Sequence, residues 1–274
     1  MMDRPNSSAS SDKEICARFS KAYSLLEKDG HDPEAIGLLR ENVIGNCSSS
    51  AVLLGCVYSQ GSDEERRESV KLFRKAAALG NSSGMRNLGY CYAVGINTEK
   101  DKAEGARWYR MAAEAGNARA MCNLGVMYDF GNGVEKDPEQ AFKWFLMSAE
   151  NGYARGMTNL GELYMQGRGT GKDIAEAEKW FVKSGSPRAT FHLAEIYAEM
   201  KDDPDMGMKY LRMSADMGYS KALVRYGLLT EDENPESARE MFLKAAAKGN
   251  TAAIELLEER GIPVPESRRK KKSK

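Results

Sequence analysis

The sequence has 274 residues, and its 40 Lys and Arg balance its 40 Asp and Glu, so no overall field favours nucleic acid or a membrane surface. The balance hides an asymmetry, because residues 268–274 carry six positive charges and no acid, which leaves 34 positive against 40 negative charges elsewhere. The five cysteines form no CxxC pair and have no regular spacing, which excludes a disulfide framework and favours a reduced, intracellular protein.

The first residues of the chain are polar. Residues 1–11 lack the apolar region of a signal peptide, and we expect them to be disordered. Ser11-x-x-Glu14 matches a capping box that would start a helix running to about Lys28, and Asp32-Pro33 would start a second one. Residues 12–46 are therefore predicted to form a degenerate first helical unit. No stretch of the chain is long and apolar enough to span a bilayer.

An internal repeat begins in the next segment. The pattern small-x-x-x-Leu-Gly-x-x-Tyr recurs in strong or weakened form, with its Leu position 31 to 36 residues apart. That position is held by Leu54, Leu88, Leu124, Leu160, Leu193, Tyr226 and Leu257. Such a period is typical of helix-turn-helix solenoids. Residues 47–261 are therefore predicted to hold about six repeats and a terminal helix, in an all-α fold.

Each repeat is predicted to contain two helices. In the first, the small residue, Leu and Tyr fall at i, i+4 and i+8 and form one buried stripe. The Gly after Leu costs helix stability, so its recurrence indicates close approach of the second helix. The second helix starts at an Asp or Asn cap and carries aromatic pairs predicted to lie in the core. These pairs include Trp108-Tyr109, Trp144-Phe145 and Trp180-Phe181.

The C-terminal segment 262–274 is predicted to be a disordered basic tail, because Pro263 and Pro265 prevent further helix. Its basic residues are Arg268, Arg269, Lys270, Lys271 and Lys272. The tail could be solvated, act as a nuclear import signal in a eukaryote, or attract nucleic acid without sequence preference. A net charge of −6 on the rest of the chain argues against nucleic-acid binding, so we do not expect it.

The run from Ala120 to Ala149, with Asn-Leu-Gly-Val-Met-Tyr, Gly-Asn-Gly-Val and Lys-Asp-Pro-Glu-Gln-Ala, resembles the consensus of the Sel-one-like repeats. These are relatives of the tetratricopeptide repeats. The resemblance implies a right-handed α-α superhelical solenoid that acts as a non-enzymatic adaptor for protein or peptide partners. It implies no cofactor, and capped ends favour a monomer. We expect a cytoplasmic protein, or a nuclear one if the tail acts as an import signal.

Residues that could carry chemistry are sparse. His31 lies in a predicted turn, and His192 occupies the slot held by Asn87, Asn123 and Asn159 in other repeats, which favours a structural hydrogen-bonding role. No metal-ligand motif or phosphate-binding loop is present. The alternative of a repeat-based hydrolase with penicillin-type chemistry rests on Ser10-x-x-Lys13, without the accompanying Lys-Thr-Gly. We expect no catalytic residue.

The resemblance also places a partner-binding groove on the first helices, at positions five and two before the Leu and two, five and six after it. The residues predicted to line it are Arg86, Tyr90, Arg119, Val126, Phe130, Arg155, Glu162, Arg188, Glu195 and Lys221. The same slots also hold Cys122, Thr158 and Phe191. Four of the predicted lining residues are cations in one slot near a helix N-terminus, where the macrodipole disfavours positive charge. They could form a row for an acidic or phosphorylated peptide, or be solvated or paired with acids of the next repeat.

Overall fold

The computed structural model describes residues 7–265, which are helical apart from the turns and loops between helices. The chain divides into two compact units, of which unit 1 ends at Asn151 and unit 2 begins at Gly152. Of the residues 1–11 that were predicted to be disordered, residues 1–6 lie outside the described residues and residues 7–11 belong to the first helix. The basic tail residues Arg268, Arg269, Lys270, Lys271 and Lys272 also lie outside the described residues.

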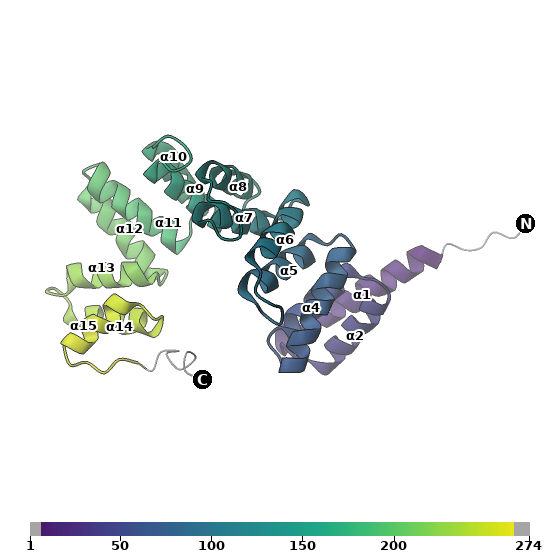
Figure 1. The fold of residues 1–274 in the computed structure, drawn as a ribbon. Helices are drawn as coiled ribbons and strands as arrows, with labels where there is room; N and C mark the ends of the chain where they lie inside the picture. Colours follow the sequence, from purple (N-terminus) through teal and green to yellow (C-terminus); the bar gives the residue numbers. More distant parts are fainter. Residues whose placement is uncertain (1–6, 266–274) are drawn as a thin grey trace, which may run out of the picture. The chain divides into compact units, whose positions relative to one another are not determined.

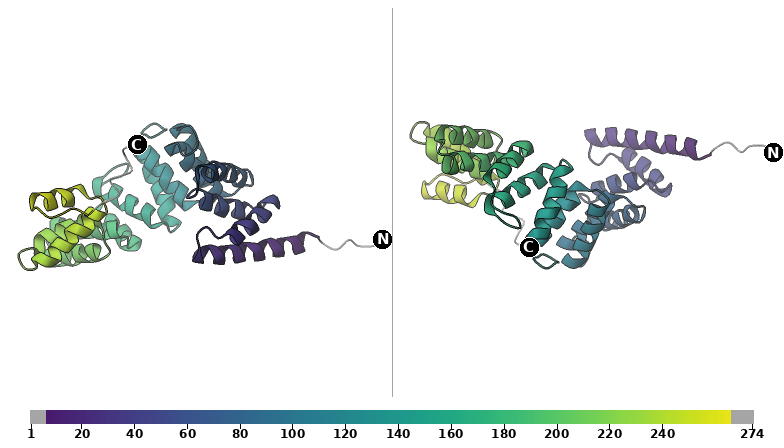
Figure 2. Two further views of the ribbon diagram at one scale, coloured as in Figure 1. Left: turned by 90° about the horizontal axis from the view of Figure 1, so that it is seen from below. Right: turned by 90° about the horizontal axis from the view of Figure 1, so that it is seen from above.

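Unit 1 consists of four antiparallel helix pairs, in which consecutive helices pack side by side in sequence order (Figures 1 and 2). Its helices are α1 (Ser7–Lys28), α2 (Pro33–Ile44), α3 (Ser48–Tyr58), α4 (Asp63–Ala78), α5 (Ser82–Val94), α6 (Lys102–Glu114), α7 (Ala118–Phe130) and α8 (Pro138–Glu150).

Unit 2 is also a succession of helix pairs and ends on a single helix (Figure 1). Its elements are α9 (Ala154–Gln166), α10 (Ile174–Ser184), α11 (Pro187–Glu195), the π-helix η1 (Ile196–Met200), α12 (Pro204–Asp216), α13 (Ser220–Thr230), α14 (Pro235–Ala247) and α15 (Thr251–Glu259). We call α3, α5, α7, α9, α11 and α13 the A helices. Their partners α4, α6, α8, α10, α12 and α14 are the B helices.

The predicted core is confirmed. Leu88, Leu124 and Leu160 are fully buried, as is the small residue before each of them in the stripe. The Gly after each Leu faces an aromatic ring of the B helix, so closely that a Cβ at Gly125 would lie 2.7 Å from Phe145. Real Cβ contacts are longer than this, and the recurring Gly therefore permits the A and B helices to approach one another.

The predicted helix starts and stops are also confirmed in the central repeats. The carboxylates of Asp101, Asp137 and Asp173 accept hydrogen bonds from the backbone N–H three residues later, at 2.9, 3.0 and 3.0 Å. Each satisfies a donor that the first helical turn leaves without a partner. Gly131 and Gly167 end α7 and α9 in the left-handed conformation, with φ of +68° at both positions.

One local prediction is wrong, a second is confirmed only in part, and one local feature was not predicted. The first helix begins at Ser7, so Ser11 lies inside α1 and is not its N-cap, because no Gly or Pro stands between Pro5 and Gly30 to stop the helix. Trp108 and Trp144, predicted to lie in the core, are only partly buried but pack against it. The residue after each Trp lies about 100° further round the helix and is buried in the core. The π-helical turn at Ile196–Met200 was not predicted.

Candidate functional site

The A helices α5 and α7 of unit 1 expose apolar side chains at the slots two and six residues after the Leu. Tyr90, Val94 and Phe130 are 50%, 48% and 67% exposed, and Val126 is partly buried. The two helices are neighbours, since the Asn117 side chain at the start of α7 donates to Ser82 at the start of α5. We call these four side chains the apolar face of unit 1.

Two basic residues predicted for the groove lie on the same two helices. Arg119 is exposed in the first turn of α7, as predicted from its slot. Arg86 is partly buried on α5, where its guanidinium donates to the side chain of Asn87. Both cations are therefore carried by the helices that carry the apolar face.

In unit 2, the predicted residues Glu162, Arg188 and Glu195 are brought together by His192. Nε2 of His192 lies 2.7 Å from Glu162 on α9, and Nδ1 lies 2.7 Å from Glu195 on its own helix. Nε of Arg188 lies 3.0 Å from Glu162, and its guanidinium also donates to Asn159. Arg188 is thus paired with an acid of the neighbouring repeat, which is the alternative to a free cationic row.

The charge network extends into the last repeat. Arg225 on α13 lies 3.0 Å from Glu199 and 3.9 Å from Glu195. Arg155 and Lys221 occupy the same slot as Arg188 but are exposed, and within the described residues no acid forms an ion pair with either. We call Glu162, Arg188, His192, Glu195, Glu199 and Arg225 the charge network of unit 2.

The slot directly before the Leu has a role that sequence reasoning found only in part. Each of three side chains in this slot contacts the preceding repeat. Asn87 donates to Cys56 at 3.6 Å, His192 contacts Glu162, and Arg225 lies 3.9 Å from Glu195. The predicted structural hydrogen-bonding role of the slot is confirmed. The acids of the slot two residues after the Leu complete the pattern, and their recurrence could have revealed the pairing.

The slot two residues before the Leu was assigned wrongly to the groove. Its side chains Cys122, Thr158 and Phe191 are 0%, 2% and 7% exposed. The groove position inferred from tetratricopeptide repeats therefore does not apply to these residues, because their side chains pack inside the repeat. Arg86 in the same slot is partly buried, and its guanidinium donates to Asn87.

The electrostatics of His192 follow from its two carboxylate neighbours. Burial lowers its pKa, but the hydrogen bonds to Glu162 and Glu195 and their negative charge outweigh burial and raise the pKa above 6.5. Its ring also stacks on Phe181, with centroids 5.1 Å apart. The side chain is 16% exposed, so these neighbours leave only a small part of it in contact with solvent.

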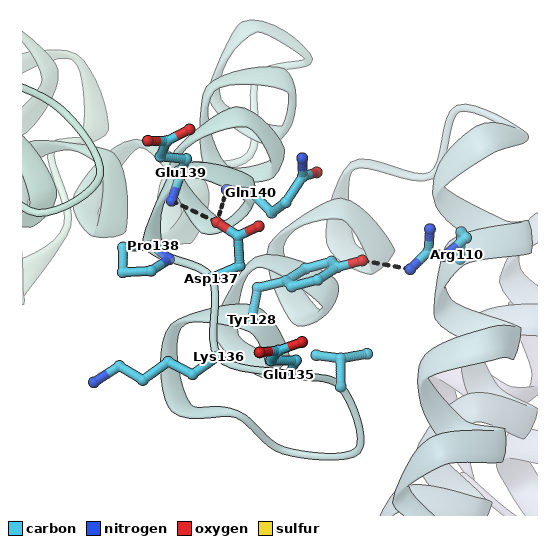
Figure 3. Close-up of a pocket in the computed structure, with 9 residues that line it drawn as sticks. Arg110, Tyr128, Glu135, Lys136, Asp137, Pro138, Glu139 and Gln140 are labelled. Carbon is cyan, nitrogen blue, oxygen red and sulfur yellow. Dashed lines mark hydrogen bonds between the residues drawn. The ribbon is translucent and has the colours of Figure 1, made fainter.

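A polar pocket of about 800 Å³ lies in unit 1 between α6, α7 and the start of α8 (Figure 3). Its most prominent polar groups already have structural partners, because Arg110 donates to the Tyr128 hydroxyl and Asp137 caps α8. The Arg–Tyr pair recurs as Arg40–Tyr58 and Arg74–Tyr92. The pocket is therefore bordered by contacts that belong to the repeat itself.

Within residues 7–265, no three His, Cys, Asp or Glu side chains are placed to hold a metal ion. None of the helices in that range combines the length and the apolar character needed to cross a membrane.

Comparisons with known proteins place the repeats in a family. The Sel1 repeat model matches residues 48–81, 82–117, 118–153, 154–186, 187–219 and 222–250. Among solved structures, the chain is similar to a Sel1 repeat protein from Oxalobacter formigenes, with 25% identity and a TM-score of 0.73 over 83% of this chain and 96% of that one.

It is also similar to a protective antigen with an SLR fold from uropathogenic Escherichia coli, with 26% identity and a TM-score of 0.68 over 92% of this chain. The match covers 58% of the antigen. A comparison with curated proteins found no match. The six matched repeats and their arrangement show that this chain belongs to the Sel1 repeat family.

Proposed function

We propose that this protein is a non-enzymatic scaffold that binds partner proteins on its A helices, chiefly on the apolar face of unit 1. Sel1 repeat proteins are generally scaffolds for protein interactions. The observation that carries the proposal is the exposure of Tyr90, Val94 and Phe130 on adjacent A helices. Exposed apolar side chains that gather on one face are typical of interaction sites.

The proposed occupant is an extended peptide segment that is acidic or phosphorylated and carries an apolar side chain. Full burial of an apolar side chain stabilises a complex by about 1.5–3 kcal/mol, so Tyr90 and Phe130 can supply much of the affinity. Arg119 and Arg86 lie on the same helices and complement negative charge on the segment. In unit 2, Arg155 and Lys221 extend this preference, whereas Arg188 is committed to Glu162.

The test compares two double variants of the full chain. Tyr90→Ser with Phe130→Ser removes the apolar face, and Met111→Ser with Met147→Ser removes apolar side chains of 44% and 41% exposure from the B helices of the same unit. Partners captured from the native host are quantified by mass spectrometry, and their binding segments are synthesised for affinity measurement. We expect the first variant to bind at least about tenfold more weakly and the second to bind normally.

Charge reversal provides a second arm of the same test. Arg119→Glu with Arg155→Glu should weaken the binding of acidic segments and leave their neutral Asn and Gln analogues less affected. Equal capture by the parent chain and by both double variants of the A helices would refute the proposal. Equal affinity for acidic and neutral segments would refute the proposed occupant alone.

The hydrolase alternative receives no specific support from the site. Both ring nitrogens of His192 face carboxylates, which leaves neither to activate a hydroxyl or thiol. Ser10 and Lys13 lie in α1. A cytoplasmic or, through the basic tail, nuclear location remains an expectation from the sequence, and deletion of residues 267–274 followed by localisation of the protein tests it. Nucleic-acid binding through the tail remains an alternative that the sequence does not favour.

A further inference from the structure

Three departures from the repeat pattern meet at one point in unit 2. The slot before the Leu holds Asn87, Asn123 and Asn159 in three successive repeats, but His192 in the next. The slot two residues after the Leu holds Tyr90 and Val126 in unit 1, but glutamate in the two repeats that contact His192. All three changes occur where the side chains touch.

The geometry requires a proton. Each ring nitrogen of His192 lies 2.7 Å from a carboxylate oxygen, of Glu162 on one side and Glu195 on the other. Ionised carboxylates only accept hydrogen bonds, and a neutral imidazole has one N–H and one acceptor nitrogen. Both contacts are therefore hydrogen bonds only while the ring is protonated.

The charges around His192 make the net charge of the network depend on the protonation of its ring. The groups that face His192 and its two carboxylates are Glu162 from α9, Arg188 and Glu195 from α11, Glu199 from η1, Arg225 from α13, and the Tyr219 hydroxyl before α13. With a protonated ring, three cations balance three carboxylates. Loss of the proton leaves one net negative charge and places an acceptor nitrogen against an acceptor oxygen.

We propose that protonation of His192 controls a hydrogen-bonded link between α9 and α11, which we call the clasp. The protonated ring joins the two A helices and neutralises the charge network of unit 2, whereas the neutral ring releases one carboxylate and makes the network anionic. The clasp goes beyond the proposed scaffold function and is tested without a partner. Its bearing on binding rests on that function, because release would make the A helices of unit 2 less favourable for an acidic segment.

The direction of the pH effect follows from the raised pKa of His192. A base whose pKa is higher in the folded state stabilises the fold fully below its unfolded value of about 6.5. That stabilisation is lost as pH rises through the folded value. Unit 2 is thus expected to be held most firmly at mildly acidic pH and to loosen as the solution becomes alkaline.

The experiment uses the full chain, whose only two histidines are His31 and His192. Histidine ring signals are followed by NMR from about pH 5 to about pH 9, with assignment by His31→Asn. We expect the midpoint of His192 to lie above 6.5 and Glu162→Gln to lower it. A midpoint of His192 at or below its unfolded value of about 6.5 would overturn the proposal.

A second measurement tests whether protonated His192 holds α9 and α11 together. His192→Asn restores the residue of the other repeats and removes the titration. Hydrogen exchange in α9 and α11, corrected for its intrinsic pH dependence, should accelerate with rising pH in the parent chain and in His31→Asn, but not in His192→Asn. The same pH response in all three proteins would show that His192 does not join the helices. The NMR titration of the parent chain decides the charge part even if a variant fails to fold.

Discussion

Two pairs of A helices pack in the same way but present different surfaces, namely α5 and α7 in unit 1 and α9 and α11 in unit 2. We call their shared packing of Leu, Gly and aromatic side chains the frame. At the slot two residues after the Leu, unit 1 has Tyr90 and Val126, and unit 2 has Glu162 and Glu195. The first pair belongs to an exposed apolar face, and the second is tied into hydrogen bonds and ion pairs. The repeat therefore specifies the packing of the helix pair and leaves this slot open to different chemistry.

The frame itself is nearly identical in the two units. A Cβ at Gly125 would lie 2.7 Å from Phe145 in unit 1, and a Cβ at Gly161 would lie 2.6 Å from Phe181 in unit 2. Changes to the frame should therefore act alike in both units, and changes to the open slot should not.

The largest expected effects come from the buried leucines. Leu124→Ala and Leu160→Ala each remove a fully buried side chain, and each should lower the free energy of unfolding by about 2–5 kcal/mol. Denaturation by urea measures both. A loss confined to one of the two variants would break the claim of a common frame.

The recurring glycines should have the next largest effect. Gly125→Ala and Gly161→Ala each place a methyl group against an aromatic ring, and overpacking of this kind costs about 1–3 kcal/mol. Better helix propensity of Ala offsets up to about 1 kcal/mol. We expect a net loss of stability for both variants in the same urea titration, and a gain in either would contradict the close-approach explanation.

The smallest effects should separate the units. Glu162→Gln removes a carboxylate that accepts from His192 and Arg188 and should cost about 1–2 kcal/mol, whereas Val126→Thr in the same slot of unit 1 should change stability by less than about 0.5 kcal/mol. Hydrogen exchange of α9 and α7 locates each effect. An equal loss of unfolding free energy in the two variants would show that this slot does not differ between the two units.

Much of the fold could be predicted from the sequence because its signals are local. The i, i+4, i+8 stripe, the Asp caps such as Asp137 and the helix-ending Gly131 each act within one or two turns of helix. The start of α1 and the π-helical turn were missed, since no local residue forces either of them.

The candidate site was less accessible to sequence reasoning. Glu162, Arg188 and Glu195 were named one by one as groove residues, but the partnership of His192 with Glu162 joins positions 30 residues apart. It depends on how far a side chain reaches across a helix interface. The same reason explains why Cys122 was assigned to the groove although it is buried, because slot numbers do not specify the depth at which a side chain lies.

The most direct test of the central claim is hydrogen exchange on the full chain with and without a partner captured from its host. We expect slower exchange in the peptides of α5 and α7, with the effect lost in the Tyr90→Ser and Phe130→Ser variant. Protection confined to the B helices α6 and α8, with α5 and α7 unchanged, would contradict binding on the A helices.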